Sequence, residues 1–114
     1  MSDEAAAEPV SGEVLASVAE FLGIDAARVG RKSPSFAANP AACANCGKKL
    51  DFYDFVTTAA ESGEHSKEFM IRFLDSNLSM GRTLPVALTC SACNDKNQVT
   101  VSYYYSPGVC GQQI

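Results

Sequence analysis

The residues best suited to chemistry in this chain are four cysteines in two equally spaced pairs, Cys43-x-x-Cys46 and Cys90-x-x-Cys93. Two residues between the cysteines let the backbone turn so that both sulfur atoms face one tetrahedral ion. Two such pairs supply the four thiolates of a closed structural zinc site, which keeps no open position for a substrate. The sequence therefore predicts a Zn²⁺ site that joins the two ends of residues 47–89 and stabilises the fold without catalysis.

The residue after each pair supports this prediction. Gly47 follows the first pair and Asn94 follows the second, and both residue types accept the positive φ of a tight turn. The string Cys43-Ala-Asn-Cys46-Gly47-Lys48 resembles the knuckles of the zinc-ribbon and rubredoxin-like class. The resemblance covers both pairs and the second hairpin but not residues 47–89, and it implies a fold element that serves many functions. A single iron, disulfides or redox use of the cysteines are the alternatives.

The other candidate residues favour binding over catalysis. Cys110 is a candidate reactive thiol or attachment point, and its simpler interpretation is a small apolar residue. His65 is the only histidine and has no neighbouring acid–base partner in the sequence. Tyr103, Tyr104 and Tyr105 are candidates for contact with a partner, and in a strand Tyr104 faces away from the other two.

The sequence contains no glycine-rich phosphate loop and no common hydrolase or metalloprotease motif. We therefore expect no enzymatic activity and no small-molecule substrate, with a reaction based on Cys110 as the alternative.

Three segments with apolar residues at helical spacing must position these groups: residues 12–22, 52–61 and 67–75. Ser11 is the expected N-cap of the first and Gly23 its C-cap, and Asp51 is the expected N-cap of the second. The third also alternates like a strand, and we favour the helix although Ile71 would then lie on its polar side. Residues 30–42 contain two prolines and are predicted to be a connector.

Alternating apolar residues on either side of the second cysteine pair predict a C-terminal β-hairpin with that pair at its tip. The predicted fold is α+β, a small zinc-stabilised domain with this hairpin and two or three short helices. Its domain limits are a flexible acidic tail over residues 1–10, a single zinc-clasped domain over residues 11–106 and a loose tail over residues 107–114. The expected core residues are Val14, Leu15, Val18, Phe21, Phe55, Phe73, Leu88 and Val101.

Composition and charge narrow the function. Of the 114 residues, 46% are apolar and 19% charged, as in a globular domain. Residues 1–25 contain six of the 13 acidic residues and none of the nine basic ones, and no strongly basic cluster follows. This charge distribution argues against a nucleic-acid partner. No apolar run is long enough for a membrane helix, and the acidic start is unlike a signal peptide, so we expect a cytoplasmic or nuclear location.

These observations favour a non-catalytic, zinc-stabilised module that binds another protein. The alternatives are a zinc-ribbon factor associated with nucleic acid or transcription, and a substrate-like protein that is modified in its C-terminal tail. The sequence does not identify the partner, the pathway or the oligomeric state.

Overall fold

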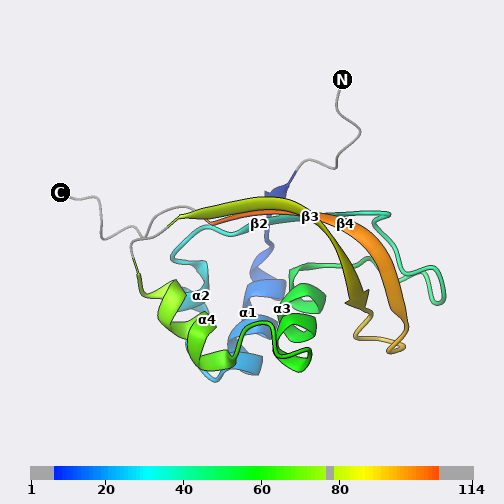
Figure 1. Cartoon of the computed structure of the whole chain (residues 1–114). Coiled ribbons are helices and arrows are strands. Elements are labelled where there is room, and N and C mark those ends of the chain that lie inside the picture. The colour runs from blue at the N-terminus through cyan, green and yellow to red at the C-terminus, as the bar shows by residue number, and fades with distance from the viewer. Residues whose placement is uncertain (1–6, 77–78, 106–114) are drawn as a thin grey trace.

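The computed structural model describes residues 7–76 and 79–105, which form one antiparallel sheet with helices on one of its faces (Figure 1). The strands are β1 (Glu8–Pro9), β2 (Ser35–Asn39), β3 (Met80–Thr89) and β4 (Lys96–Tyr105), in the spatial order β1-β2-β4-β3. The helices are α1 (Gly12–Leu22), α2 (Ala26–Gly30), α3 (Phe52–Glu61) and α4 (Lys67–Leu74). The predicted α+β class is confirmed. The described residues contain four helices because Ala26–Gly30 forms a short turn of helix that the sequence analysis did not anticipate.

The helix ends follow from local chemistry. The Ser11 hydroxyl accepts a hydrogen bond from the Val14 N–H and begins α1. Gly23 ends α1 with φ 77°, and both its own N–H and that of Ile24 donate to carbonyls of the last turn. The ambiguous third segment is helical, as favoured, and the Ser66 hydroxyl caps it. Ile71 is only partly buried, and it packs against the core.

The predicted connector over residues 30–42 is wrong in its middle, where Ser35–Asn39 form β2, an interior strand of the sheet. The small and proline-rich composition hid a short alternation in which Phe36 and Ala38 point to the helices and are buried. The strand also pairs with Glu8–Pro9, so the segment predicted as an acidic tail reaches the sheet at its end. Antiparallel pairing with β4 supplies the hydrogen bonds that the short strand could not make alone.

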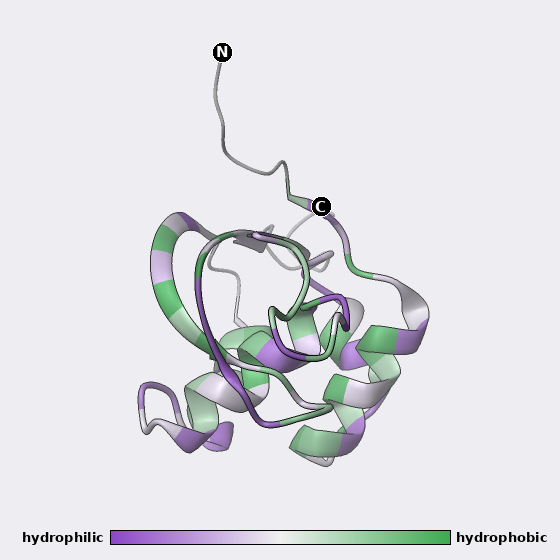
Figure 2. Ribbon diagram, turned by 90° about the vertical axis from the view of Figure 1, so that its right-hand side faces the viewer, coloured by the Kyte–Doolittle hydropathy of each residue, from purple (hydrophilic) through white to green (hydrophobic). Residues whose placement is uncertain are grey.

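The long C-terminal hairpin is confirmed, with β3 paired to β4 along ten residues and the second cysteine pair at its tip. Pro85 lies inside β3, where a proline is tolerated because β3 is at the edge of the sheet. Among the expected core residues, Val18, Leu88 and Val101 are buried, and Val14, Leu15, Phe21 and Phe55 are partly buried and pack against the core. Phe73 is also partly buried. Figure 2 shows polar and apolar positions alternating around the helices, as expected for helices that cover one face of a sheet.

The end of α1 gives a first prediction. We expect Gly23→Ala to lower the free energy of unfolding by about 1 kcal/mol, because a Cβ is strained at positive φ. No atom lies within 4 Å of the added Cβ, so the loss would measure backbone strain alone. Gly12→Ala is the matched control, since its Cβ also meets nothing and its φ is outside the left-handed region. Urea unfolding of both variants provides the measurement, and equal stabilities would contradict the prediction.

Candidate metal centre

The fold brings the four predicted cysteines together from two distant segments. Their Sγ atoms all lie within 4.8 Å of one another. Two contacts link the pairs, Cys43 to Cys93 and Cys46 to Cys90, each with 3.6 Å between the sulfur atoms. A tetrahedral ion with metal–sulfur bonds of about 2.3 Å places its sulfur ligands about 3.8 Å apart, whereas a disulfide bond is about 2.05 Å long. The spacing therefore fits four ligands around one ion and not two disulfides.

The two cysteine pairs have the same backbone geometry. In the first, the Cys43 N–H donates to the Lys48 carbonyl at 2.8 Å and the Gly47 N–H donates to the Cys43 carbonyl at 2.9 Å. In the second, the N–H groups of Cys90 and Asn94 make the equivalent bonds, to Asp95 at 2.9 Å and to Cys90 at 2.7 Å. Gly47 and Asn94 have the positive φ predicted for them, 81° and 66°.

Asn97, on β4, links the two pairs directly. Its side-chain oxygen accepts a hydrogen bond from the Ala44 N–H at 2.9 Å, and its Nδ2 lies 3.5 Å from the Cys43 sulfur. The same Nδ2 donates to the Asp95 carbonyl next to the second pair. Asn97 is only 7% exposed, so its amide is held in place by these bonds. Asn97 was not predicted from the sequence, because its spacing from the two cysteine pairs matches no known metal-site motif.

Hydrogen bonds at the site also change the acidity of its thiols. The Cys46 N–H and the Asn97 amide lower the pKa of Cys43 to about 6. This favours the thiolate, which is the form that binds metal. For Cys46 the Lys48 N–H acts to lower the pKa, but the neighbouring Cys90 thiol and burial together raise it to about 12. Without a bound ion, the Cys43 thiol therefore loses its proton more readily than the Cys46 thiol.

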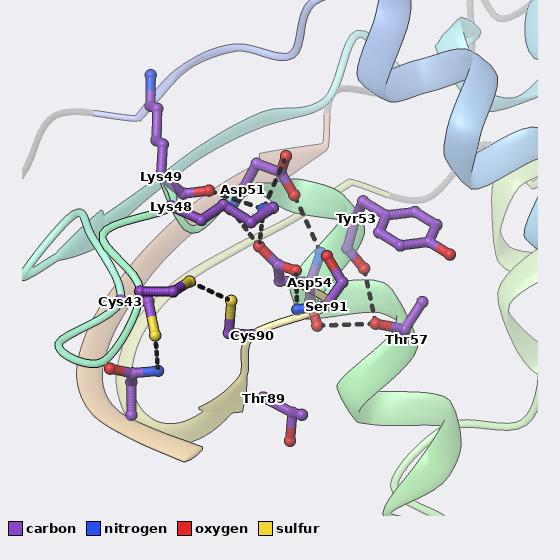
Figure 3. A network of polar contacts seen from close by, with 12 residues as sticks. Cys43, Lys48, Lys49, Asp51, Tyr53, Asp54, Thr57, Thr89, Cys90 and Ser91 are labelled. Carbon is purple, nitrogen blue, oxygen red and sulfur yellow. Dashed lines mark hydrogen bonds and ion pairs between the residues drawn. The ribbon is translucent and has the colours of Figure 1, made fainter. Parts of the chain in front are cut away.

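A buried carboxylate, Asp54, connects the cysteine pairs to the helical layer (Figure 3). Its Oδ1 accepts a hydrogen bond from the Ser91 N–H at 2.9 Å, within the second pair. Its Oδ2 lies 2.8 Å from Lys48 Nζ, next to the first pair, and also accepts from the Asp51 N–H at 2.9 Å. Asp51 and Asp54 form a reciprocal capping box at the start of α3. One side chain thus joins α3 to both halves of the site.

Burial and these contacts shift the pKa values of Asp51, Asp54 and Lys48. Burial alone would raise the pKa of Asp54, but the hydrogen bonds from Lys48 and Ser91 lower it below its ordinary value. Burial raises the pKa of Asp51. Burial opposes the charge on Lys48, yet its hydrogen bond to Asp54 raises its pKa. Asp54 is therefore ionised and paired in the folded protein. The pattern Asp51-x-x-Asp54 is the sequence signal that could have identified it.

The other predicted residues lie apart from the cysteines. Tyr103 and Tyr105 face the helices and make ring contacts with Phe55 and Phe73, respectively. Tyr104 is on the opposite face of the sheet and is 47% exposed. His65 is exposed and stacks on Phe69. Cys110 and residues 107–114 lie outside the described residues.

Fold and site together define a small α+β domain with a candidate four-cysteine metal centre at the tip of its hairpin. The chain belongs to the family described as Domain of unknown function (DUF8243), whose model matches residues 2–108. No curated protein and no solved structure matches it. Within residues 7–76 and 79–105, no helix has the length and apolar character needed to cross a membrane.

The Asp54 contacts give a second prediction. We expect Asp54→Asn to lower the free energy of unfolding by about 2–4 kcal/mol, because the amide leaves Lys48 without its buried anionic partner. Asp75→Asn is the matched control, since Asp75 also accepts from a cation, Arg28 at 2.6 Å, but on the surface. Exposed pairs of this kind contribute little to stability. Chemical unfolding of both variants measures their free energies of unfolding. Equal losses of stability would contradict a special role for Asp54.

Proposed function

We propose that this protein is a non-catalytic protein-binding module whose fold is stabilised by one structural Zn²⁺ ion bound to Cys43, Cys46, Cys90 and Cys93. The observation that carries the metal assignment is the mutual approach of the four sulfur atoms within 4.8 Å. Four thiolates complete a tetrahedral shell, which suits a structural ion and leaves no position for a reacting water or substrate. The matching turns at Gly47 and Asn94 support the zinc-ribbon and rubredoxin-like resemblance.

The proposed zinc ion also offsets the entropy cost of closing the long segment between the two cysteine pairs. Residues 47–89, which contain α3, α4 and β3, run from one cysteine pair to the other. Closing a segment of this length costs conformational entropy, and a metal bound only by the folded chain offsets that cost. A single iron would bind the same four ligands, so the metal itself must be measured.

The third prediction concerns this ion. We expect about one zinc per chain by elemental analysis, and loss of the cooperative thermal transition after complete chelation under reducing conditions. Cys43→Ser should lose the metal and the transition, whereas Cys110→Ser, which removes the one cysteine that belongs to neither pair, should keep both. If elemental analysis finds iron in place of zinc, the bound ion is iron. An unchanged transition in the metal-free protein would refute its structural role.

The proposed binding surface is the open face of the sheet, which the helices do not cover (Figure 1). Strand alternation and the pairing register place a continuous set of side chains on this face: Ser35, Ala37, Asn39, Thr83, Pro85, Ala87, Thr89, Lys96, Gln98, Thr100, Ser102 and Tyr104. Lys96, at the first position of β4, is the one charged residue among them. The hydrogen bond between the Thr83 and Ser102 hydroxyls, 3.1 Å long, lies within this open face.

Tyr104 is the large side chain of the open face, and its ring lies over Gly81 on β3. A Cβ added to Gly81 would be only 2.8 Å from Tyr104 Cδ1, so the ring is held close to the strand. A fixed, half-exposed tyrosine surrounded by small neutral residues has the properties of an interface hot spot. A nucleic-acid partner would need a cluster of basic residues, whereas this face carries Lys96 alone, at the other end of β4 from Tyr104. The open face therefore favours a protein partner.

The fourth prediction tests the open face. Affinity capture from cells that express the protein should enrich at least one protein on the wild type. Tyr104→Ala should reduce its capture about tenfold or more. Phe69→Ala is the matched control, because Phe69 is 42% exposed but lies on α4, in the helical layer. Thermal melting must first show that both variants are folded. Equal capture by all three proteins would refute the assignment, and salt-sensitive retention on DNA or RNA would favour the nucleic-acid class.

A further inference from the structure

A second candidate site lies in the helical layer, on the face of the sheet opposite Tyr104. A cavity of about 70 Å³ lies there, bounded by α3, α4 and β4 and, at its inner end, by residues of α1 and α2. Aromatic rings form much of its wall, among them Phe55, Phe73, Tyr103 and Tyr105. None of the described residues that line the cavity is an acid, a lysine, an arginine or a cysteine. The cavity is therefore separate from the candidate metal centre.

The rings hold one another in place around this space. Ring centroids are 5.1 Å apart for Phe55 and Tyr103, 5.6 Å for Tyr103 and Tyr105, and 5.0 Å for Phe73 and Tyr105. Rigid rings in tilted and edge-to-face contact cannot collapse into a gap as flexible aliphatic side chains do. The Tyr103 hydroxyl points to Met80, with 3.6 Å between its oxygen and Sδ. Water would find few partners in such a space, which suits an apolar guest.

The cavity opens to solvent beside α4. Of its lining residues, His65 and Phe69 are exposed, and their rings stack with 4.6 Å between centroids. Met70 and Met80 are partly buried, and methionine side chains adapt easily to the shape of a guest. A ligand can therefore enter at this end, whereas Val18, Leu22 and Leu74 close the inner end.

Size and wall chemistry limit what the cavity can bind. A cavity of about 150 Å³ holds a benzene molecule, so one half as large holds about three carbon atoms. Apart from His65 at the opening, the lining side chains are aliphatic, aromatic or methionine, and so they favour an apolar group. We infer that the cavity is a binding site for the end of a straight alkyl chain, carried by a small amphiphilic molecule whose polar end leaves past His65 and Phe69.

The fifth prediction compares two isomeric alcohols on the metal-loaded wild-type protein. 1-Pentanol ends in an unbranched chain, whereas 2,2-dimethyl-1-propanol ends in a tert-butyl group of four carbon atoms, which exceeds the volume of the cavity. Each methylene that enters contributes about fourfold in affinity, so 1-pentanol should bind at least about tenfold more tightly. Chemical shifts of the Met70 and Met80 methyl groups should report the binding. Equal affinities, or shifts confined to residues outside the cavity, would overturn the inference.

A filled cavity provides the second arm of the test. Ala59 lines the cavity and Ala60, its neighbour on α3, does not. Ala59→Leu should weaken 1-pentanol binding about tenfold, and Ala60→Leu should leave it unchanged. Undiminished binding by a folded Ala59→Leu protein would overturn the inference. If Ala59→Leu does not fold, the comparison of isomers on the wild type still decides. Neither result depends on the open face, so the two proposals fail or succeed separately.

Discussion

The constraint on which the rest of the structure depends is the meeting of the two cysteine pairs. Residues 43–46 precede α3 and residues 90–93 follow β3, so their contact fixes both ends of the segment that contains α3, α4 and β3. This contact brings the start of α3 close to the end of β3, where the Thr89 N–H also donates to the Thr58 hydroxyl at 3.0 Å. A domain of this size has a limited hydrophobic core, so a long-range link of this kind matters more to it than it would to a larger domain.

Asp54 transmits this constraint to the helices. A carboxylate with no exposed surface is stable only when its oxygen atoms are paired. Here the partners are Asp51 just before α3, Lys48 beside the first cysteine pair and Ser91 within the second. Asp54 therefore belongs to the capping box that begins α3 and also forms hydrogen bonds beside both cysteine pairs. The start of α3 cannot shift without breaking hydrogen bonds at the centre. This coupling fixes the helix whose rings form one wall of the apolar cavity.

Much of the local structure could be predicted from the sequence. Apolar spacing and capping residues located the helices at 12–22 and 52–61 to the residue, and the two pairs with Gly47 and Asn94 predicted the knuckles and their positive φ. Local patterns failed for β2, whose five residues carry too little alternation between flanking prolines. They also failed for Asn97, which contacts the sulfur of Cys43, 54 residues away in the chain. Contacts between residues this far apart cannot be recognised from local sequence patterns.

The sequence by itself therefore determined the four cysteines of the candidate metal centre, the turns that present them, the helix ends and the alternation that turns Tyr104 away from Tyr103 and Tyr105. These features depend on residues within a few positions of one another, where backbone geometry and side-chain chemistry act directly. Only the tertiary structure decided which residues surround the thiols, how Asp54 joins three segments, which sheet face stays uncovered and where a cavity forms. Tertiary packing determines these features, because each depends on surfaces that come into contact only in the folded chain.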